Sequence, residues 1–141
     1  KSIYCTLLLL STSICSFAQN VSIPDSAFRA YLLSESTINT NGDTLIQNTE
    51  ALAYTGKITF SAIPSTTDLT GLGAFENITE LELFYGSFTQ VDLSKNTLLT
   101  KLTIKLTMLP SIDLSANTIL EDVYCEKNDS LTSLDGLTVM Y

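Results

Sequence analysis

Apolar and polar residues repeat along this chain with a fixed period. Three blocks with apolar residues at their first, fourth and sixth places begin at Ile78, Leu99 and Leu120, and each starts 21 residues after the one before (78 to 99, 99 to 120). Alternation within each block predicts a short strand whose alternate side chains point inward, at 81–83, 102–104 and 123–125. Because one coil of this kind cannot bury its apolar face alone, the repeat predicts stacked coils with neighbouring parallel strands.

The segment after each strand repeats as well. Its recurring positions are Phe88, Leu109 and Leu131, then the matching segments 91–94 and 112–115 with a looser copy at 134–137, then Asn96 and Asn117. Asp, Ser and Asn side chains bond nearby backbone groups, so these segments predict a turn and a short helical or irregular return across the core. A first, irregular coil is expected over residues 57–72, with a strand at 58–60 and a turn from Pro64 to Thr67.

The residues before the repeats predict a short helix. Asp25 or Ser26 can cap its start, and Phe28, Tyr31 and Leu32 then fall on one face. A cap is physically required at this end, because the first coil would otherwise expose its core side to water. We therefore expect residues 19–56 to form an N-terminal helical cap.

The spacing of Ile78, Leu81, Leu83, Phe88 and Val91 resembles the leucine-rich repeat pattern, with the short period of secreted bacterial members such as the internalins. The resemblance covers about residues 55–137. It implies an α/β fold, a leucine-rich repeat solenoid with short parallel strands and an N-terminal helical cap. About three to four coils are expected over residues 57–141, with the solenoid incomplete at its C-terminal side.

The chain departs from this family at one turn position. The Asn whose side chain bonds the inner backbone in the family is kept only as Asn128, whereas Gly86 and Thr107 occupy the equivalent places. The family's ladder of Asn side chains is thus expected to be absent, and the first two turns are expected to be looser than usual.

Residues 1–18 have the layout of a secretory signal peptide. They begin with Lys1, continue with an apolar run that is too short to span a bilayer, and end in small residues before a cleavage site ahead of Gln19. This predicts a secreted or cell-surface protein without a membrane span. Lipid attachment at Cys15 is the less favoured alternative, because Ile14 precedes it instead of a small residue.

The amino-acid composition excludes several kinds of partner and of catalytic chemistry for this chain. Without residues 1–18 the chain keeps 6 of its 7 basic and all 15 acidic residues, for a net charge of −9, so nucleic acid is not expected as a partner. The chain has no His, which removes the commonest general base and typical zinc ligands. Cys125 would be the one remaining cysteine, and the repeat pattern places it in the core. We expect no enzymatic activity.

Residues 39–50 resemble a degenerate calcium-binding loop of the EF-hand family. The positions that match its ligand places are Asn39, Asn41, Asp43, Leu45 (through its carbonyl oxygen) and Glu50. Asn39 replaces the usual acidic first residue, and Thr44 replaces the Gly of the sharp turn. The resemblance implies weak Ca²⁺ binding that fastens the cap. The alternative is a metal-free turn between two helices.

The exposed strand positions form the candidate binding surface. They are Glu80, Glu82, Phe84, Lys101, Thr103, Lys105, Asp122, Tyr124 and Glu126. In leucine-rich repeat proteins partners bind the concave strand face, which implies an extracellular binding or adhesion module for a protein or glycan ligand. The alternatives are cross-strand ion pairs alone, a structural spacer in a larger surface protein, or a non-catalytic part of a secreted enzyme.

Overall fold

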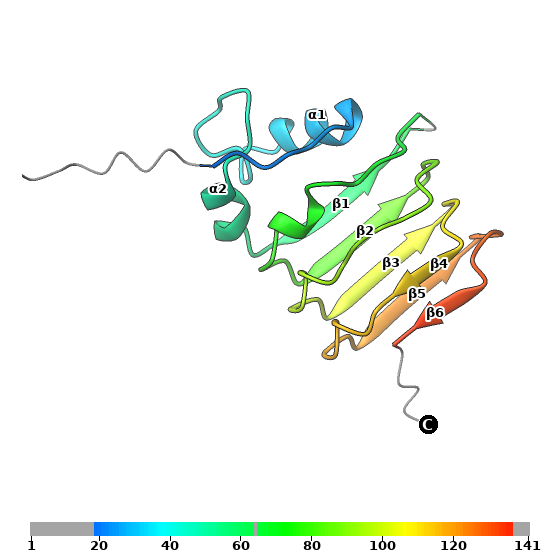
Figure 1. Cartoon of the computed structure of the whole chain (residues 1–141). Helices are drawn as coiled ribbons and strands as arrows, with labels where there is room; N and C mark the ends of the chain where they lie inside the picture. The colour runs from blue at the N-terminus through cyan, green and yellow to red at the C-terminus, as the bar shows by residue number, and fades with distance from the viewer. Residues whose placement is uncertain (1–18, 64, 137–141) are drawn as a thin grey trace, which may run out of the picture.

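Four short strands lie side by side in one parallel sheet in the computed structural model, which describes residues 19–63 and 65–136 (Figure 1). They are β1 (Lys57–Ser61), β2 (Glu80–Phe84), β3 (Lys101–Lys105) and β5 (Asp122–Glu126). The predicted signal peptide and Pro64 lie outside the described residues. The protein is a parallel β-solenoid of about four turns with a short N-terminal helical region, as the stacked-coil prediction requires.

The strands pair in the register that the repeat predicts. Leu81 lies beside Leu102, and Leu102 lies beside Val123. The predicted strand of the first, irregular coil is also confirmed, since Ile58 pairs with Leu81. In β1, β2 and β3 the inward-facing positions are buried and the alternate positions are more exposed, so one side of the sheet faces a core and the other faces solvent.

The return segments differ from the prediction in the last two coils. There they form two short parallel strands, β4 (Ser111–Asp113) and β6 (Ser133–Asp135), instead of a helical or irregular return. Stacking one side of each coil in register also brings the return segments into register, so their backbones can pair. The predicted turns are confirmed, because Asp92 and Asp113 each accept the backbone N–H two residues on, at 2.9 Å.

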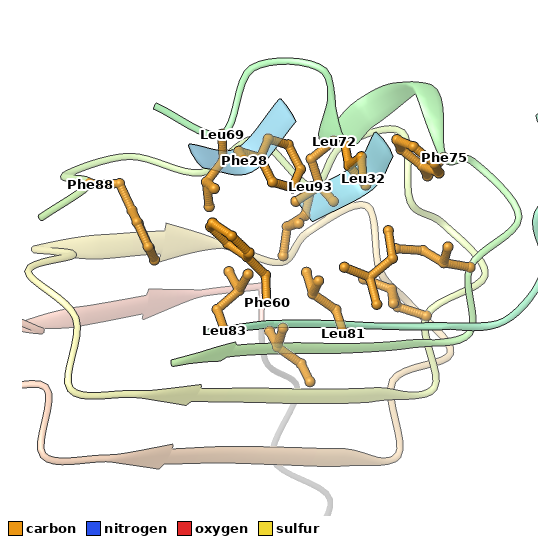
Figure 2. Packing of buried hydrophobic residues seen from close by; sticks show 14 of the residues in the cluster. Phe28, Leu32, Phe60, Leu69, Leu72, Phe75, Leu81, Leu83, Phe88 and Leu93 are labelled. Atoms are coloured by element: carbon orange, nitrogen blue, oxygen red, sulfur yellow. The ribbon is translucent and has the colours of Figure 1, made fainter. Parts of the chain in front are cut away.

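The core lies between the sheet and the return segments, and it is apolar. Figure 2 shows Leu81 and Leu83 of the sheet directed toward Leu72 and Leu93 of the returns. All four side chains are buried, and Leu72 begins the short 3₁₀ helix η1 (Leu72–Ala74). This side-chain layer supplies the apolar burial that holds adjacent coils together.

A ladder of buried asparagine side chains runs through the return side of this core. Asn96 donates its amide N–H groups to the carbonyl oxygens of Phe75 at 2.8 Å and Leu72 at 3.3 Å. One coil later, Asn117 donates to those of Asn96 at 2.8 Å and Leu93 at 3.1 Å. Each amide therefore satisfies the backbone of the preceding coil. An inner Asn ladder does exist in this protein, at a different position from the family's turn Asn.

At the turn positions Gly86, Thr107 and Asn128, the three coils form different contacts. Gly86 has φ +96°, and a Cβ atom there would come within 2.6 Å of the Phe88 ring. At the next coil, the Oδ1 of Asn128 accepts both the backbone N–H and the hydroxyl of Thr107 at 2.9 Å. Asn128 also donates to the Ile104 carbonyl at 2.8 Å, so its side chain bonds the backbone of the preceding coil.

The N-terminal cap covers the β1 end of the solenoid (Figure 1). Helix α1 (Ser26–Ser34) starts where predicted, and the Asp25 carboxylate caps it by accepting two backbone N–H groups. Phe28 and Tyr31 pack on Phe60 of β1 at ring-centroid distances of 5.1 and 5.2 Å. Helix α2 (Asn48–Ala53) follows. Among the described residues, no helix is long and apolar enough to cross a membrane.

Two tyrosine hydroxyls form hydrogen bonds with backbone groups of the edge strand β1. The Tyr31 hydroxyl accepts the Thr59 N–H at 3.2 Å, and the Tyr54 hydroxyl donates to the Lys57 carbonyl at 2.7 Å. An unpaired edge strand is a template for pairing with another chain. The cap thus blocks this edge with hydrogen bonds as well as apolar packing.

The strand β5 is less buried than the pattern predicts. Cys125 was expected in the core, but it is only half-buried, as is Val123. In the part of the chain that the structure describes, β5 is the last strand of its sheet, so one of its sides has no neighbouring coil. Partial burial raises the pKa of the Cys125 thiol through desolvation.

The substitution Asn117→Ala tests the buried ladder. It removes the donors to two carbonyl groups of the preceding coil, so we expect the free energy of unfolding to fall by about 1–3 kcal/mol in urea denaturation. The control Asn77→Ala removes one exposed bond to the Leu52 carbonyl and should cost less than about 1 kcal/mol. Equal costs for the two variants would contradict a special role for the buried amide.

Candidate binding face and candidate calcium loop

The strand face is the solvent-facing side of β1, β2, β3 and β5. Its predicted lateral rows are all present, because β2, β3 and β5 pair with no shift in register. The rows are Glu80, Lys101 and Asp122; Glu82, Thr103 and Tyr124; and Phe84, Lys105 and Glu126. The structure therefore brings all nine predicted partner-binding residues onto one surface.

Two of these rows contain ion pairs. The Lys101 and Asp122 charged groups are 3.4 Å apart, and those of Lys105 and Glu126 are 3.2 Å apart. The first pair is well exposed, with side-chain exposures of 45% and 69%. Exposed pairs of this kind contribute about 0–1 kcal/mol, so their groups can exchange partners for a ligand at little cost.

The sequence-based prediction of this face omitted its three β1 positions, Lys57, Thr59 and Ser61. The ammonium group of Lys57 lies 2.8 Å from the Glu82 carboxylate, and the Thr59 hydroxyl donates to the other Glu82 oxygen at 3.0 Å. These two bonds, the Lys57 bond first, lower the pKa of Glu82. The strand predicted at 58–60 could have revealed these residues. Extending the lateral rows to that strand places Lys57 beside Glu80 and Thr59 beside Glu82.

Tyr124 is the most distinctive side chain of the strand face. It is 51% exposed, its hydroxyl donates to Glu126 at 3.1 Å, and the Lys105 ammonium lies 4.4 Å from the centre of its ring. The bonds from Lys105 and Tyr124 lower the pKa of Glu126. These contacts at the hydroxyl and at the ring face orient the Tyr124 ring in this structure, and a ring that is ordered before binding loses less freedom when a ligand packs on it.

The candidate calcium loop of residues 39–50 is organised by the Glu50 carboxylate. One oxygen accepts the Thr40 backbone N–H at 2.8 Å, the Thr40 hydroxyl at 3.0 Å and the Asn41 N–H at 3.3 Å. The other accepts the Gln47 N–H at 3.0 Å. Burial by itself raises the pKa of Glu50, but these donors, led by Gln47, outweigh burial and lower it. The carboxylate therefore closes the loop onto the start of α2.

Asp43 and Asn41 form a second network in the loop. The Asp43 carboxylate accepts the Leu45 N–H at 2.7 Å and side-chain amide groups from Gln47 at 2.9 Å and Asn41 at 3.1 Å. Asn41 in turn accepts the Asp43 N–H at 2.8 Å. The side-chain oxygens of Asn41 and Asp43, at the predicted third and fifth ligand places, therefore each accept a hydrogen bond from the other residue. The side chain of Leu45 is exposed.

Asn39, at the predicted first ligand place, contains a buried oxygen without a donor. Its side-chain amide donates to the carbonyls of Leu33 at 3.2 Å and Asp43 at 3.0 Å, and the residue is only 7% exposed. These two carbonyl acceptors fix the amide nitrogen, which leaves Oδ1 without a hydrogen-bond partner. Buried oxygens in this state are unfavourable unless a donor or a cation satisfies them.

The donor set of the loop fits calcium in kind but is low in charge. It offers hard oxygen ligands, which Ca²⁺ prefers, yet only Asp43 and Glu50 carry charge. Over residues 19–63 and 65–136, no group of three or more acidic or cysteine side chains is placed to hold a metal ion. Calcium would therefore depend on amide and carbonyl oxygens in addition to these two carboxylates.

Neither the protein-family models nor the curated proteins include one that matches this chain.

The stabilising role of Glu50 predicts a pH dependence. Its folded-state pKa is lowered, so its contribution is present above the unfolded value of about 4.3 and is lost as the pH falls through the folded-state pKa. Glu50→Gln should lower the free energy of unfolding by about 1–3 kcal/mol at neutral pH, and by progressively less below about pH 4. Urea denaturation between pH 7 and pH 3 measures this difference.

The matched control is Glu76→Gln, at an exposed position in a turn. It should leave the free energy of unfolding within about 0.5 kcal/mol of the parent chain at each pH. A Glu50→Gln cost that stayed constant down to pH 3 would contradict the assignment.

Proposed function

We propose that this protein is a leucine-rich repeat module of the extracellular or cell-surface type that binds a protein or glycan partner on its strand face. The observation that carries the proposal is the register of the four strands, which gathers aromatic, cationic and anionic side chains into ordered rows on one exposed surface. Secretion follows from the signal-peptide pattern of residues 1–18. Most of the charged groups on this face are paired with one another. This arrangement favours a role in recognition over a role in catalysis.

Repeat solenoids use their extended stacked faces for binding because each added coil adds one more row of side chains. On this chain the rows run across the coils, so a partner that crosses the strands meets a residue from each coil. The aromatic residues Phe84 and Tyr124 supply the kind of side chain that dominates binding energy at protein surfaces.

Paired substitutions on the two sides of the solenoid test this proposal. Partners are found by screening the full chain on arrays of extracellular protein domains and of glycans. Thr103→Arg places a bulky charge at the centre of the strand face and should weaken binding at least tenfold. Thr118→Arg makes the same change at an exposed return position and should leave the affinity unchanged. Equal effects of the two variants would support the spacer alternative.

We also propose that the cap binds Ca²⁺ weakly through Asn39, Asn41, Asp43, the Leu45 carbonyl and Glu50. Among the described residues, four buried side-chain oxygens have no hydrogen-bond partner, and the Oδ1 of Asn39 is the one that lies at a ligand place of the candidate loop, where a cation would satisfy it. Bound calcium supplies positive charge that draws these oxygens together and so stabilises the cap. The side-chain amide groups of Asn41 and Gln47 that now face Asp43 compete with the ion, which is a further reason for weak binding.

Calorimetric titration of the full chain with calcium chloride tests this role. Asn39→Asp restores the missing acidic ligand and should tighten binding at least tenfold, with a matching rise in thermal stability at saturating calcium. Glu50→Gln should abolish the binding heat. If neither the parent chain nor Asn39→Asp gives heat or a thermal shift, the loop is a metal-free turn.

A further inference from the structure

A shallow pocket of about 220 Å³ is present on the strand face where β3 and β5 run side by side. Its lining includes Lys101 and Thr103 from β3 and Asp122 and Tyr124 from β5, all of which are solvent-facing positions of the sheet. The pocket thus combines one aromatic ring, one hydroxyl group, one cation and one carboxylate.

The Tyr124 ring and the Lys101–Asp122 ion pair bound this pocket on opposite sides. Asp122 and Tyr124 are two residues apart on one strand, which corresponds to about 6.6 Å along the sheet. Thr103 lies directly beside Tyr124 on the neighbouring strand and contributes a hydroxyl in the same row as the ring. A pocket of about 220 Å³ that opens onto the strand face is of a size to take a single six-membered ring.

The groups around the pocket match the chemistry of a sugar. A pyranose ring presents C–H groups on its faces, which pack on an aromatic ring, and hydroxyl groups at its rim. A hydroxyl both donates and accepts hydrogen bonds, so neighbouring hydroxyls satisfy a carboxylate and an ammonium group at the same time. Asp122 and Lys101 offer that acceptor and donor 3.4 Å apart.

The charge of the strand face favours an uncharged ligand. The chain as a whole has a net charge of −8, but the solvent-facing positions of β1, β2, β3 and β5 carry three lysines and four carboxylates, a net charge of −1. Most of these charges are paired with each other. A polycation would meet three lysines here and a polyanion four carboxylates, whereas a neutral polyhydroxylated ligand meets no net repulsion.

We propose that the pocket beside Tyr124 binds one pyranose unit of an uncharged polysaccharide. This inference rests on the proposed function and names the class of ligand that the strand face takes. The Tyr124 ring packs on the sugar face, and Lys101, Thr103 and Asp122 bond the sugar hydroxyls. The contacts of Tyr124 with Glu126 and Lys105 hold the ring upright before the sugar arrives, which reduces the ordering cost of binding.

Affinity electrophoresis of the full chain tests this ligand class. The native gels contain a soluble β-glucan, a mannan, a xylan or the polyanion alginate as probes. We expect at least one neutral polysaccharide to retard the chain, and retardation to persist at about 0.5 M salt, where exposed charge–charge attraction is screened. The retarding polymer's hexasaccharide is then titrated by calorimetry.

Variants at two tyrosines decide whether the pocket is responsible. Tyr124→Ala should weaken hexasaccharide binding at least tenfold, and Tyr124→Phe, which keeps the ring, should weaken it less than threefold. The control is Tyr85→Asn: Tyr85 is also 51% exposed but lies in a turn with φ +63°, a conformation that Asn tolerates. Its binding should be unchanged. Urea denaturation confirms that each variant folds.

Three results would overturn the inference: no retardation in any neutral polysaccharide, retardation in alginate alone, or equal binding by the parent chain and Tyr124→Ala. The outcome for the sugar site can be distinguished from the outcome for the proposed function. A protein partner that is lost on Thr103→Arg while no polysaccharide retards the chain would leave the recognition module in place and remove only the sugar site.

Discussion

The whole structure depends on one constraint: a single 21-residue coil cannot bury its own apolar side chains. Leu81 and Leu83 become buried only when Leu102 and Ile104 of the next coil lie beside them, at the spacing of about 4.8 Å between neighbouring strands. Every other regular feature follows from that stacking. Once the apolar residues align, the residues between them align too, whether they are lysines and carboxylates on the strand face or asparagines in the return.

Stacking also creates polar groups that must be satisfied inside the solenoid. The carbonyl groups of one return segment point toward the next coil, and the buried amides of Asn96 and Asn117 bond them. At the N-terminal end of the described solenoid, the helical cap takes the place of a preceding coil. Helix α1 supplies Phe28 for the core and Tyr31 for the edge of β1. Both the repeat and the cap therefore satisfy unpaired backbone groups. The repeat does so with an Asn in successive coils, and the cap does so with side chains at one end of the solenoid.

The two candidate sites differ in how they relate to the stacking. The strand face is a direct product of the register, so its residues on β2, β3 and β5 could be predicted from the period of 21 alone, whereas Lys57, Thr59 and Ser61 of β1 were missed. The loop of residues 39–50 has no repeat to position it. Its ligand pattern could be predicted from spacing, but the arrangement of its donors could not. The binding of Glu50 to three backbone N–H groups depends on how the loop closes over α2.

The sequence by itself determined the four strands of the main sheet, their parallel order, the register of β2, β3 and β5, and the helical cap. The period and the alternation of apolar residues are local properties, and stacking repeats them from coil to coil. The sequence also determined that α1 starts at Asp25 or Ser26, of which the structure uses Asp25 as the cap, and that Asp92 and Asp113 make turns. Only the tertiary structure decided that the last two returns pair as β4 and β6, that Asn96 and Asn117 form the inner ladder, and that Cys125 is half-buried. Each of these depends on what the neighbouring coil contributes, and burial and hydrogen bonding between coils cannot be read from one coil's residues.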